Sequence, residues 1–133
     1  MAKPEIPCPP ESQEQATLFS WAAMMERTYP QLKWMYHIPN GGSRNRVEAA
    51  RLKAEGVKPG VSDIFLPTAA GGWHGLYIEL KRQTGGKRSP EQQEFIAAMR
   101  EAGYCAEFRN GWQAAAELIV KYLEGKIPKE ESK

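Results

Sequence analysis

The sequence contains few cysteines and no long apolar run. Cys8 and Cys105 are far apart and lie in no metal-ligand spacing, so neither a disulfide framework nor a zinc site is expected. No stretch reaches the roughly 18 consecutive apolar residues that are needed to cross a bilayer. The polar, proline-rich N-terminus does not resemble a signal peptide. These absences predict a cytoplasmic protein that has no membrane partner.

The chain also has little net charge. Its balance is only +2 over 133 residues, whereas a strongly basic domain is typical of nucleic-acid binders. The basic residues nevertheless gather in two clusters, within Arg44–Lys58 and Lys81–Arg88. Composition alone favours two solvated faces, and the alternative is two patches that contact phosphates beside a site.

Hydrophobic periodicity and turn residues predict a mixed β-sheet flanked by helices, which is an α/β fold. The expected order is α-β-α-β-β-α-β-α: helix Ser12–Arg27, strand Trp34–Ile38, helix Val47–Glu55, strands Asp63–Leu66 and Trp73–Lys81 joined by a turn at 69–72, a helix opened by Ser89 and ended by Gly103, strand Tyr104–Phe108, and helix Trp112–Leu123 capped by Asn110. We expect residues 1–10 to be irregular, residues 11–124 to form the domain, and residues 125–133 to be a charged, disordered tail.

The segment Ile78–Lys81 places an acid and a base two positions apart on one of these strands. Side chains alternate across a strand, so Glu79 and Lys81 share one face, while Ile78 and Leu80 can enter the core. Taken alone, such a pair is more often a surface ion pair that contributes little to stability.

Asp63 changes this interpretation. If its strand pairs with the next one through the turn at 69–72, Asp63 comes near Glu79. Two carboxylates held together repel each other unless a cation lies between them. Mg²⁺ keeps several waters, so two carboxylates and the Leu80 carbonyl are enough to bind it. Lys81 would then orient an attacking water or offset charge in the transition state.

These residues resemble the signature of the PD-(D/E)xK nucleases, and more specifically a stand-alone VRR-NUC (virus-type replication-repair nuclease) domain. The resemblance rests on Gly60–Asp63, a spacer of fifteen residues, Glu79–Lys81, the Asn40–Gly42 loop and Ser89–Gln92. It implies a restriction-endonuclease-like fold and a DNA endonuclease that requires Mg²⁺ or Mn²⁺. It also suggests a phage or bacterial source. One departure is Ser62, which stands where the family has a proline that stiffens the turn but supplies no ligand.

The resemblance also implies a glutamate on the first helix and a glutamine on the helix after the Glu-x-Lys strand. The first is Glu11 or Glu14, and the spacing to Gln15 favours Glu11. Either could instead be an ordinary first-turn acid that complements the helix dipole. The glutamine is Gln92, for which a capping box with Ser89 is an equally good explanation.

We therefore expect Asp63, Glu79, Lys81, Glu11 and Gln92 to be catalytic, and the metal to be bound by Asp63, Glu79, Leu80 and either Glu11 or Glu14. The residues expected to bind DNA are Asn40, Arg44, Arg46, Lys53, Lys58, Lys87 and Arg88. One site cuts one strand, so we expect a homodimer that acts on branched DNA such as a Holliday junction. Its contact could use Trp21, Trp34 or Trp112. The alternative function is a non-catalytic nucleic-acid-binding module on the same fold.

Overall fold

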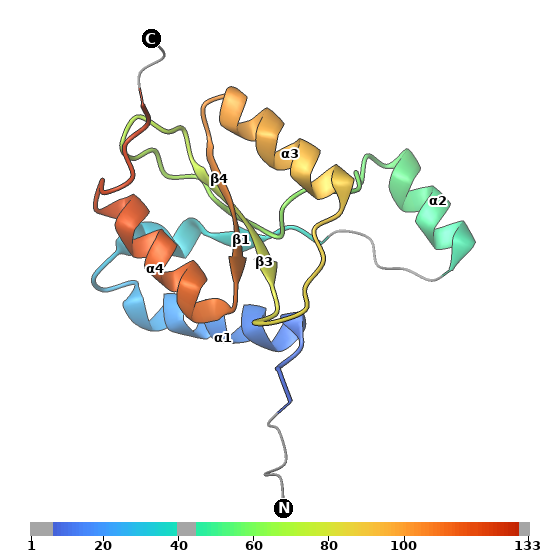
Figure 1. Ribbon diagram of the computed structural model, residues 1–133, viewed down its shortest axis with the longest axis horizontal. Helices are drawn as coiled ribbons and strands as arrows, with labels where there is room; N and C mark the ends of the chain where they lie inside the picture. The colour runs from blue at the N-terminus through green and yellow to red at the C-terminus, as the bar shows by residue number, and fades with distance from the viewer. Residues whose placement is uncertain (1–6, 40–44, 131–133) are drawn as a thin grey trace, which may run out of the picture.

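The computed structural model of the protein describes residues 7–39 and 45–130. Within these ranges the chain forms one mixed sheet with helices around it (Figure 1). The elements are α1 (Glu11–Met25), the 3₁₀-helix η1 (Pro30–Trp34), β1 (Tyr36–His37), α2 (Arg46–Ala54), β2 (Ile64–Leu66), β3 (Leu76–Lys81), α3 (Pro90–Glu101), β4 (Cys105–Asn110) and α4 (Trp112–Leu123). The predicted α/β class and the order of helices and strands are confirmed, with η1 added.

The sheet has the strand order β1-β2-β3-β4. β1 and β2 are antiparallel, β2 and β3 are antiparallel, and β3 and β4 are parallel. The turn between β2 and β3 is closed by a bridge between Ala70 and Trp73, and α3 makes the crossover that the parallel pair requires. The predicted pairing of the two central strands is confirmed, with Ile64 opposite Ile78.

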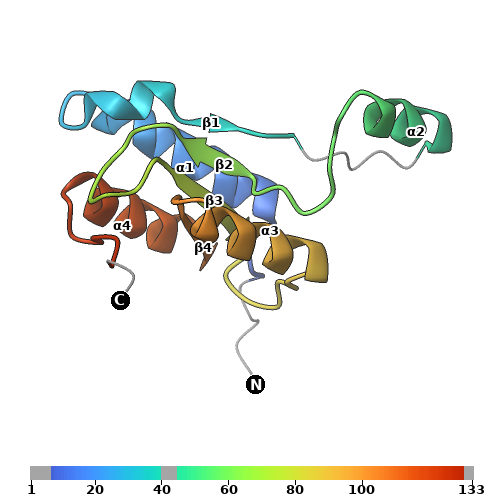
Figure 2. The ribbon, with the colours of Figure 1, turned by 90° about the horizontal axis from the view of Figure 1, so that it is seen from above.

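The hydrophobic core lies on one face of the sheet, beneath α1 and α4 (Figure 2). Alternate residues of β2 and β3 project into it, and all are buried: Ile64, Leu66, Leu76, Ile78 and Leu80. Leu18 of α1 and Ile119 of α4 are fully buried against them. Burial of each such side chain contributes about 1.5–3 kcal/mol, so this layer fixes the central strands. No helix in the described ranges is long and apolar enough to span a membrane.

α3 packs against the opposite face of the sheet. The ring of Phe95 meets the ring of Tyr77 edge-on, with 5.2 Å between their centroids. Because side chains alternate along a strand, this face also carries Glu79 and Lys81, and Asp63 just before β2. The candidate site therefore lies on the α3 side of the sheet, away from the core.

The expected strand Trp34–Ile38 is shorter than predicted. Residues 30–34 form η1, which begins with Pro30 and buries Leu32, and only Tyr36 and His37 remain in β1. Proline is favoured at the start of a helix because its φ is already helical. The aromatic composition of residues 34–38 indicated a strand. Pro30 and the buried Leu32 instead place Trp34 at the end of η1.

Asn110 does not cap the last helix, contrary to the prediction. It is the final residue of β4, and its side-chain amide donates a hydrogen bond to the carbonyl of Arg82 (2.9 Å). Gly111 occupies the N-cap position with φ +84° and has no side chain to offer. The cap comes instead from Glu14 on α1, whose Oε2 accepts a hydrogen bond from the amide of Trp112 (2.7 Å).

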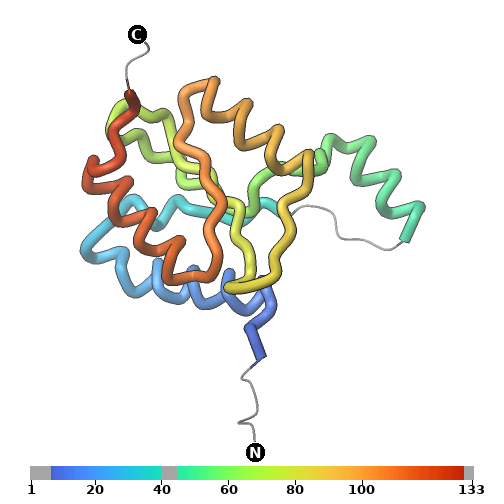
Figure 3. Tube along the Cα trace, viewed as in Figure 1, coloured from blue at the N-terminus to red at the C-terminus, as the bar shows by residue number. Residues whose placement is uncertain are grey.

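α2 stands apart from the body of the molecule (Figure 3). None of its residues is buried, and the side chain of Val47 is 79% exposed. Asn45 caps its first turn by accepting hydrogen bonds from the amides of Val47 (2.9 Å) and Glu48 (3.4 Å). The cap stabilises the first turn of α2, while burial against the sheet contributes little to this helix.

Gly60 allows the chain to pass close to the start of α3. Its φ of +86° lies in the left-handed region, and a Cβ at this position would collide with the backbone carbonyl of Glu91. Only glycine allows both this conformation and so close an approach of two backbones. Since Gly60 lies three residues before Asp63, the same contact fixes the chain that enters the candidate site.

Replacing Gly60 with alanine should destabilise the protein more than the same change at Gly56. Both glycines have a positive φ, +86° and +103°, so both variants bear the cost of a left-handed alanine. Only Gly60→Ala adds a collision, because a Cβ at residue 56 meets nothing within 4 Å. Urea unfolding should give Gly60→Ala a free energy of unfolding about 1–3 kcal/mol below that of Gly56→Ala. Equal stability of the two variants would contradict this account.

Candidate active site

Asp63 and Glu79 meet where β2 begins and β3 approaches its end. The backbone amide of Asp63 donates a hydrogen bond to Glu79 Oε2 (3.1 Å), and the amide of Leu80 donates one to Asp63 Oδ2 (2.9 Å). These contacts continue the antiparallel register beyond the pair of Ile64 and Ile78. Each carboxylate therefore accepts a hydrogen bond from the backbone of the opposing strand, which holds the two acids together.

The carbonyl of Asp63 is held from the other side by β1. It accepts a hydrogen bond from the amide of Ile38 (2.7 Å) and lies 2.8 Å from Nδ1 of His37. A carbonyl only accepts, so Nδ1 of His37 carries the hydrogen in this contact. This role of His37 was not predicted from the sequence. The contact depends on the register of β1 and β2, which the sequence did not supply.

Lys81 is 6% exposed and has two polar partners. Its Nζ donates a hydrogen bond to Gln92 Oε1 (2.9 Å) and lies 3.7 Å from Glu79 Oε1. Gln92 also completes the capping box, because Oε1 accepts from the amide of Ser89 (3.0 Å) while Ser89 Oγ accepts from the amide of Gln92 (3.1 Å). The two explanations considered for Gln92 are thus compatible: one oxygen caps α3 and contacts the lysine.

Burial and the neighbouring Asp63 raise the pKa of Glu79. Removal from water, followed by the hydrogen bond and the charge of Asp63, raises the pKa of Glu79 to about 8, and the Lys81 ammonium opposes this shift only in part. The carboxylate form of Glu79 is therefore costly beside Asp63. When both acids are ionised, they carry more negative charge than Lys81 balances.

Glu14 is buried and fully engaged away from the acid pair. It is 2% exposed; its Oε1 accepts a hydrogen bond from Gln83 Nε2 (2.8 Å), and its Oε2 accepts from the amide of Trp112. The amide of Gly111 in turn donates to the carbonyl of Lys81 (2.8 Å). Glu14 therefore ties α1 to the start of α4 and to the segment that follows β3.

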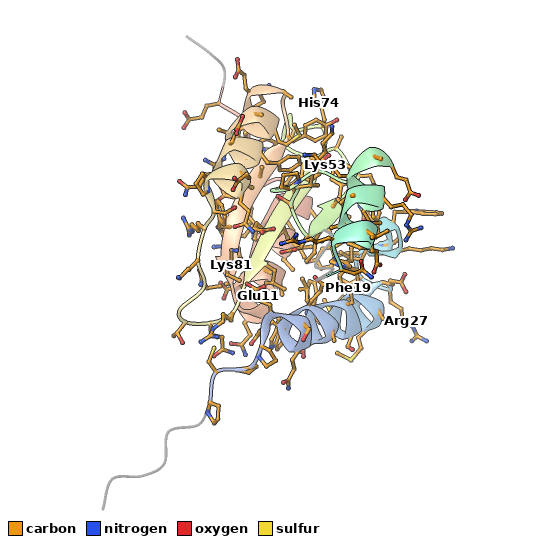
Figure 4. The ribbon with its side chains drawn as sticks, turned by 90° about the vertical axis from the view of Figure 1, so that its right-hand side faces the viewer. Glu11, Phe19, Arg27, Lys53, His74 and Lys81 are labelled. Atoms are coloured by element: carbon orange, nitrogen blue, oxygen red, sulfur yellow. The ribbon has the colours of Figure 1, made fainter. Side chains whose placement is uncertain are left out.

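Glu11 is exposed in the first turn of α1. Figures 1 and 2 place this turn beside the carboxyl end of β3, and Figure 4 labels Glu11 next to Lys81. In the described part of the chain, no three His, Cys, Asp or Glu side chains lie close enough to hold a metal ion. Neither Glu11 nor Glu14 therefore joins Asp63 and Glu79 in such a cluster.

The donor set nevertheless suits a hard divalent cation. Asp63 and Glu79 supply oxygen ligands and an excess of negative charge, and Mg²⁺ typically binds one or two carboxylates and keeps several waters. The amide of Leu80 points at Asp63, and β2 pairs with β3 only as far as Ile78. In an extended strand the carbonyl and the amide of one residue point to the same edge, so the Leu80 carbonyl lies on the side of the acids.

The candidate DNA contacts that fall in the described ranges are all exposed: Arg46, Lys53, Lys58, Lys87 and Arg88. The first two lie on α2 and the last two directly before α3, so the structure separates them into two groups. Asn40 and Arg44 lie outside the described residues.

The profile of the VRR-NUC domain family matches residues 9–113 of the chain. A solved structure described as a VRR_NUC domain protein superposes with a TM-score of 0.76 and 28% sequence identity, covering 90% of this chain and 92% of that one. No curated protein gives a significant match. The matched residues span most of the chain and include both acids, the lysine and the capping glutamine. The chain therefore belongs to the VRR-NUC domain family of nuclease-fold domains, which generally act on DNA.

Proposed function

We propose that the protein is a metal-dependent endonuclease that hydrolyses phosphodiester bonds of DNA with Mg²⁺ or Mn²⁺. The observation that carries this proposal is the pair of hydrogen bonds from the Asp63 amide to Glu79 and from the Leu80 amide to Asp63, with Lys81 buried beside the two acids. The competing function is a nucleic-acid-binding module without catalysis. Such a module would have no reason to keep two acids and a lysine together at an energetic cost.

Asp63, Glu79 and the Leu80 carbonyl would hold the metal ion. When bound, the ion supplies Lewis acidity and lowers the pKa of a coordinated water. It would also neutralise the acid pair, whose mutual repulsion now opposes the charged form of Glu79. The chain's own residues must then orient the water, the phosphate and the proton transfers.

We assign two roles to Lys81: it orients the attacking water, and it stabilises the negative charge that develops on the phosphate. Its ammonium has three hydrogens, one of which is directed at Gln92 Oε1. Gln92 is itself fixed by Ser89, so it acts as a positioning residue for the ammonium. The other hydrogens remain available for a substrate oxygen near Glu79. A preorganised donor of this kind accounts for about 10²–10³ in rate in enzymes where it has been removed.

We assign the helix-borne acid to Glu11 and a structural role to Glu14. Both carboxylate oxygens of Glu14 are already used, by Gln83 and by the amide of Trp112. Glu11 is exposed at the same end of the sheet as Lys81 (Figure 4). An exposed acid in this position can contact the site through water, which is the outer-shell role that we propose for it.

The DNA would lie along the exposed basic residues. Arg46, Lys53 and Lys58 belong to α2 and the loop after it, and Lys87 and Arg88 belong to the loop before α3. Asn40 and Arg44 complete the proposed set. Phosphate contacts of this kind position a duplex without reading its sequence. This arrangement suits an enzyme that recognises the shape of DNA rather than its bases.

A homodimer that cuts branched DNA, such as a Holliday junction, is the assembly that we propose. A twofold dimer presents two equivalent sites at a fixed distance, which matches the two equivalent strands of a four-way junction. The exposed apolar side chains include Trp34 (63%) and Tyr36 (50%), whereas Trp21 and Trp112 pack against the core. Trp34 is therefore the tryptophan that we assign to the dimer contact. We place the enzyme in the cytoplasm of a bacterium or a phage-infected host.

Cleavage should require a divalent ion and Lys81. EDTA should abolish cleavage and Mg²⁺ or Mn²⁺ should restore it, because the acids alone cannot activate water. Lys81→Met should lower the rate by about 10²–10³ and should still bind Mn²⁺ in calorimetry, since lysine is not a ligand. Glu79→Gln should weaken both cleavage and Mn²⁺ binding. Full cleavage by the wild-type protein in EDTA, or by Lys81→Met at the wild-type rate, would refute the mechanism.

Substitution of Glu11 should reduce cleavage but not stability, whereas substitution of Glu14 should reduce stability. Glu11→Gln should reduce cleavage about 10–100-fold and leave the melting temperature unchanged, because its side chain is exposed. Glu14→Gln should lower the stability by about 1–2 kcal/mol, because the amide cannot satisfy both Gln83 and Trp112 in the same way. Cleavage rates and thermal melts of both variants distinguish the roles. Loss of cleavage in a fully stable Glu14→Gln protein would reverse the assignment.

The protein should behave as a dimer that prefers junctions. Light scattering should give about twice the monomer mass, and Trp34→Ser should shift the population toward monomer because it removes an exposed apolar contact. A four-way junction should be cut faster than a linear duplex of the same sequence. A strict monomer that cuts both substrates equally would exclude junction resolution and leave the nuclease proposal standing.

A further inference from the structure

A groove of about 260 Å³ runs between α3 and the outer edge of β4. Gln93, Ile96, Ala97 and Arg100 form its helix side, because positions three and four apart share one side of a helix. Arg88 and Phe108 complete the lining. The groove thus presents two guanidinium groups and an amide around an apolar floor, a combination that suits an anion with several oxygen acceptors.

Arginine outnumbers acid around this groove. Glu107 lies 3.5 Å from Arg100 and 3.0 Å from Arg109, so one carboxylate is shared between two guanidinium groups. Arg88 lies over the ring of Phe108 at 4.4 Å. The glutamates of α3 do not line the groove. The charged residues that line the groove itself are Arg88 and Arg100, and none of the described acids lines it.

The guanidinium groups are already held in place. Nε of Arg100 donates a hydrogen bond to the carbonyl of Ala106 (2.8 Å), which fixes the side chain along the edge of β4. Nε2 of Gln93 donates to the carbonyl of Arg88 (3.1 Å), and the Phe108 ring supports the Arg88 guanidinium. Each guanidinium group thus has one contact that restricts it before a ligand binds, which lowers the conformational entropy lost on binding.

The groove lies next to the candidate active site. Phe108 is the register partner of Glu79 across the parallel pair β3 and β4, and adjacent strands lie about 4.8 Å apart. Gln93 of the groove directly follows Gln92, which contacts Lys81. A strand that leaves the acid pair around the start of α3 would therefore reach Arg88 and then Arg100.

We propose that the groove between α3 and β4 binds a backbone phosphate of the DNA, next to the phosphate that is cleaved. This inference rests on the proposed function for the identity of the ligand. It adds Arg100 and Gln93 to the contacts expected from the sequence. It also assigns Arg88 to a preformed anion site rather than to a general basic surface.

The test measures DNA binding by the Asp63→Asn protein over a range of salt concentrations. In this background Arg88→Gln and Arg100→Gln should each weaken binding several-fold and reduce the slope of log K against log salt by about 0.9, the value for one phosphate contact. The control is Arg27→Gln. Arg27 is an exposed arginine just beyond the C-terminal end of α1 (Figure 4), and its replacement should change the slope much less.

Ala97→Glu and Ala98→Glu form a matched pair that does not disturb the edge of β4. Both alanines are exposed on α3, but only Ala97 lines the groove. Ala97→Glu should weaken DNA binding several-fold, and Ala98→Glu should bind like the parent protein. Thermal melts should show that both variants fold.

Unchanged affinity and salt slope in all the groove variants would overturn the inference. It would also be overturned if inorganic phosphate occupied the groove in millimolar titrations while the groove variants left DNA binding intact, because the groove would then serve free phosphate. A wild-type protein that binds DNA through the groove but never cleaves it would refute the proposed function alone. If the wild-type protein cleaves DNA and the groove variants bind DNA normally, the inference about the groove is refuted and the proposed function stands.

Discussion

The reciprocal hydrogen bonds between Asp63 and the end of β3 are the constraint on which the rest of the candidate site depends. They bring two acids together in a poorly hydrated place, where burial, followed by the hydrogen bond and the charge of Asp63, raises the pKa of Glu79. Proteins rarely keep such an arrangement unless another charge relieves it. The buried Lys81 relieves part of the repulsion, and the proposed metal ion would relieve the remainder. The proposed function thus rests on an electrostatic imbalance in the folded chain.

At the start of α3, one side-chain oxygen both caps the helix and contacts Lys81. Oε1 of Gln92 accepts hydrogen bonds from the amide of Ser89 and from Lys81. The start of α3 and the position of the ammonium are therefore set together. Glu14 links the other side in a similar way, through the amide of Trp112 and through Gln83 after β3. The end of β3 that carries the candidate site is held by helix ends on both sides, so loss of either cap would disturb the positions of the site residues.

Local patterns in the sequence were sufficient for the fold and for the central part of the site. Alternation along β3 and the turn before it correctly predicted that Glu79 would face the chain at Asp63, because hairpin register depends on residues close in sequence. The cap of α4 was mispredicted, because the residue that makes it lies on another helix 98 positions away. The contact of His37 with Asp63 was not predicted either, because it depends on how β1 pairs with β2. Contacts between distant elements leave no periodic signal in a single sequence.

The sequence separations of these contacts have a consequence for the order in which the protein can assemble. The two hydrogen bonds of the acid pair span 16 and 17 residues, and the contact of Lys81 with Gln92 spans 11. The residues that make these three contacts leave the ribosome within a short interval, so the hairpin and its acids can come together while the C-terminal part is still being made. The bond from Trp112 to Glu14 spans 98 residues and needs nearly the whole domain. A nascent chain thus acquires the acids early, whereas the scaffold that holds them rigid arrives last. Truncated products of translation would lack the C-terminal anchor of the site.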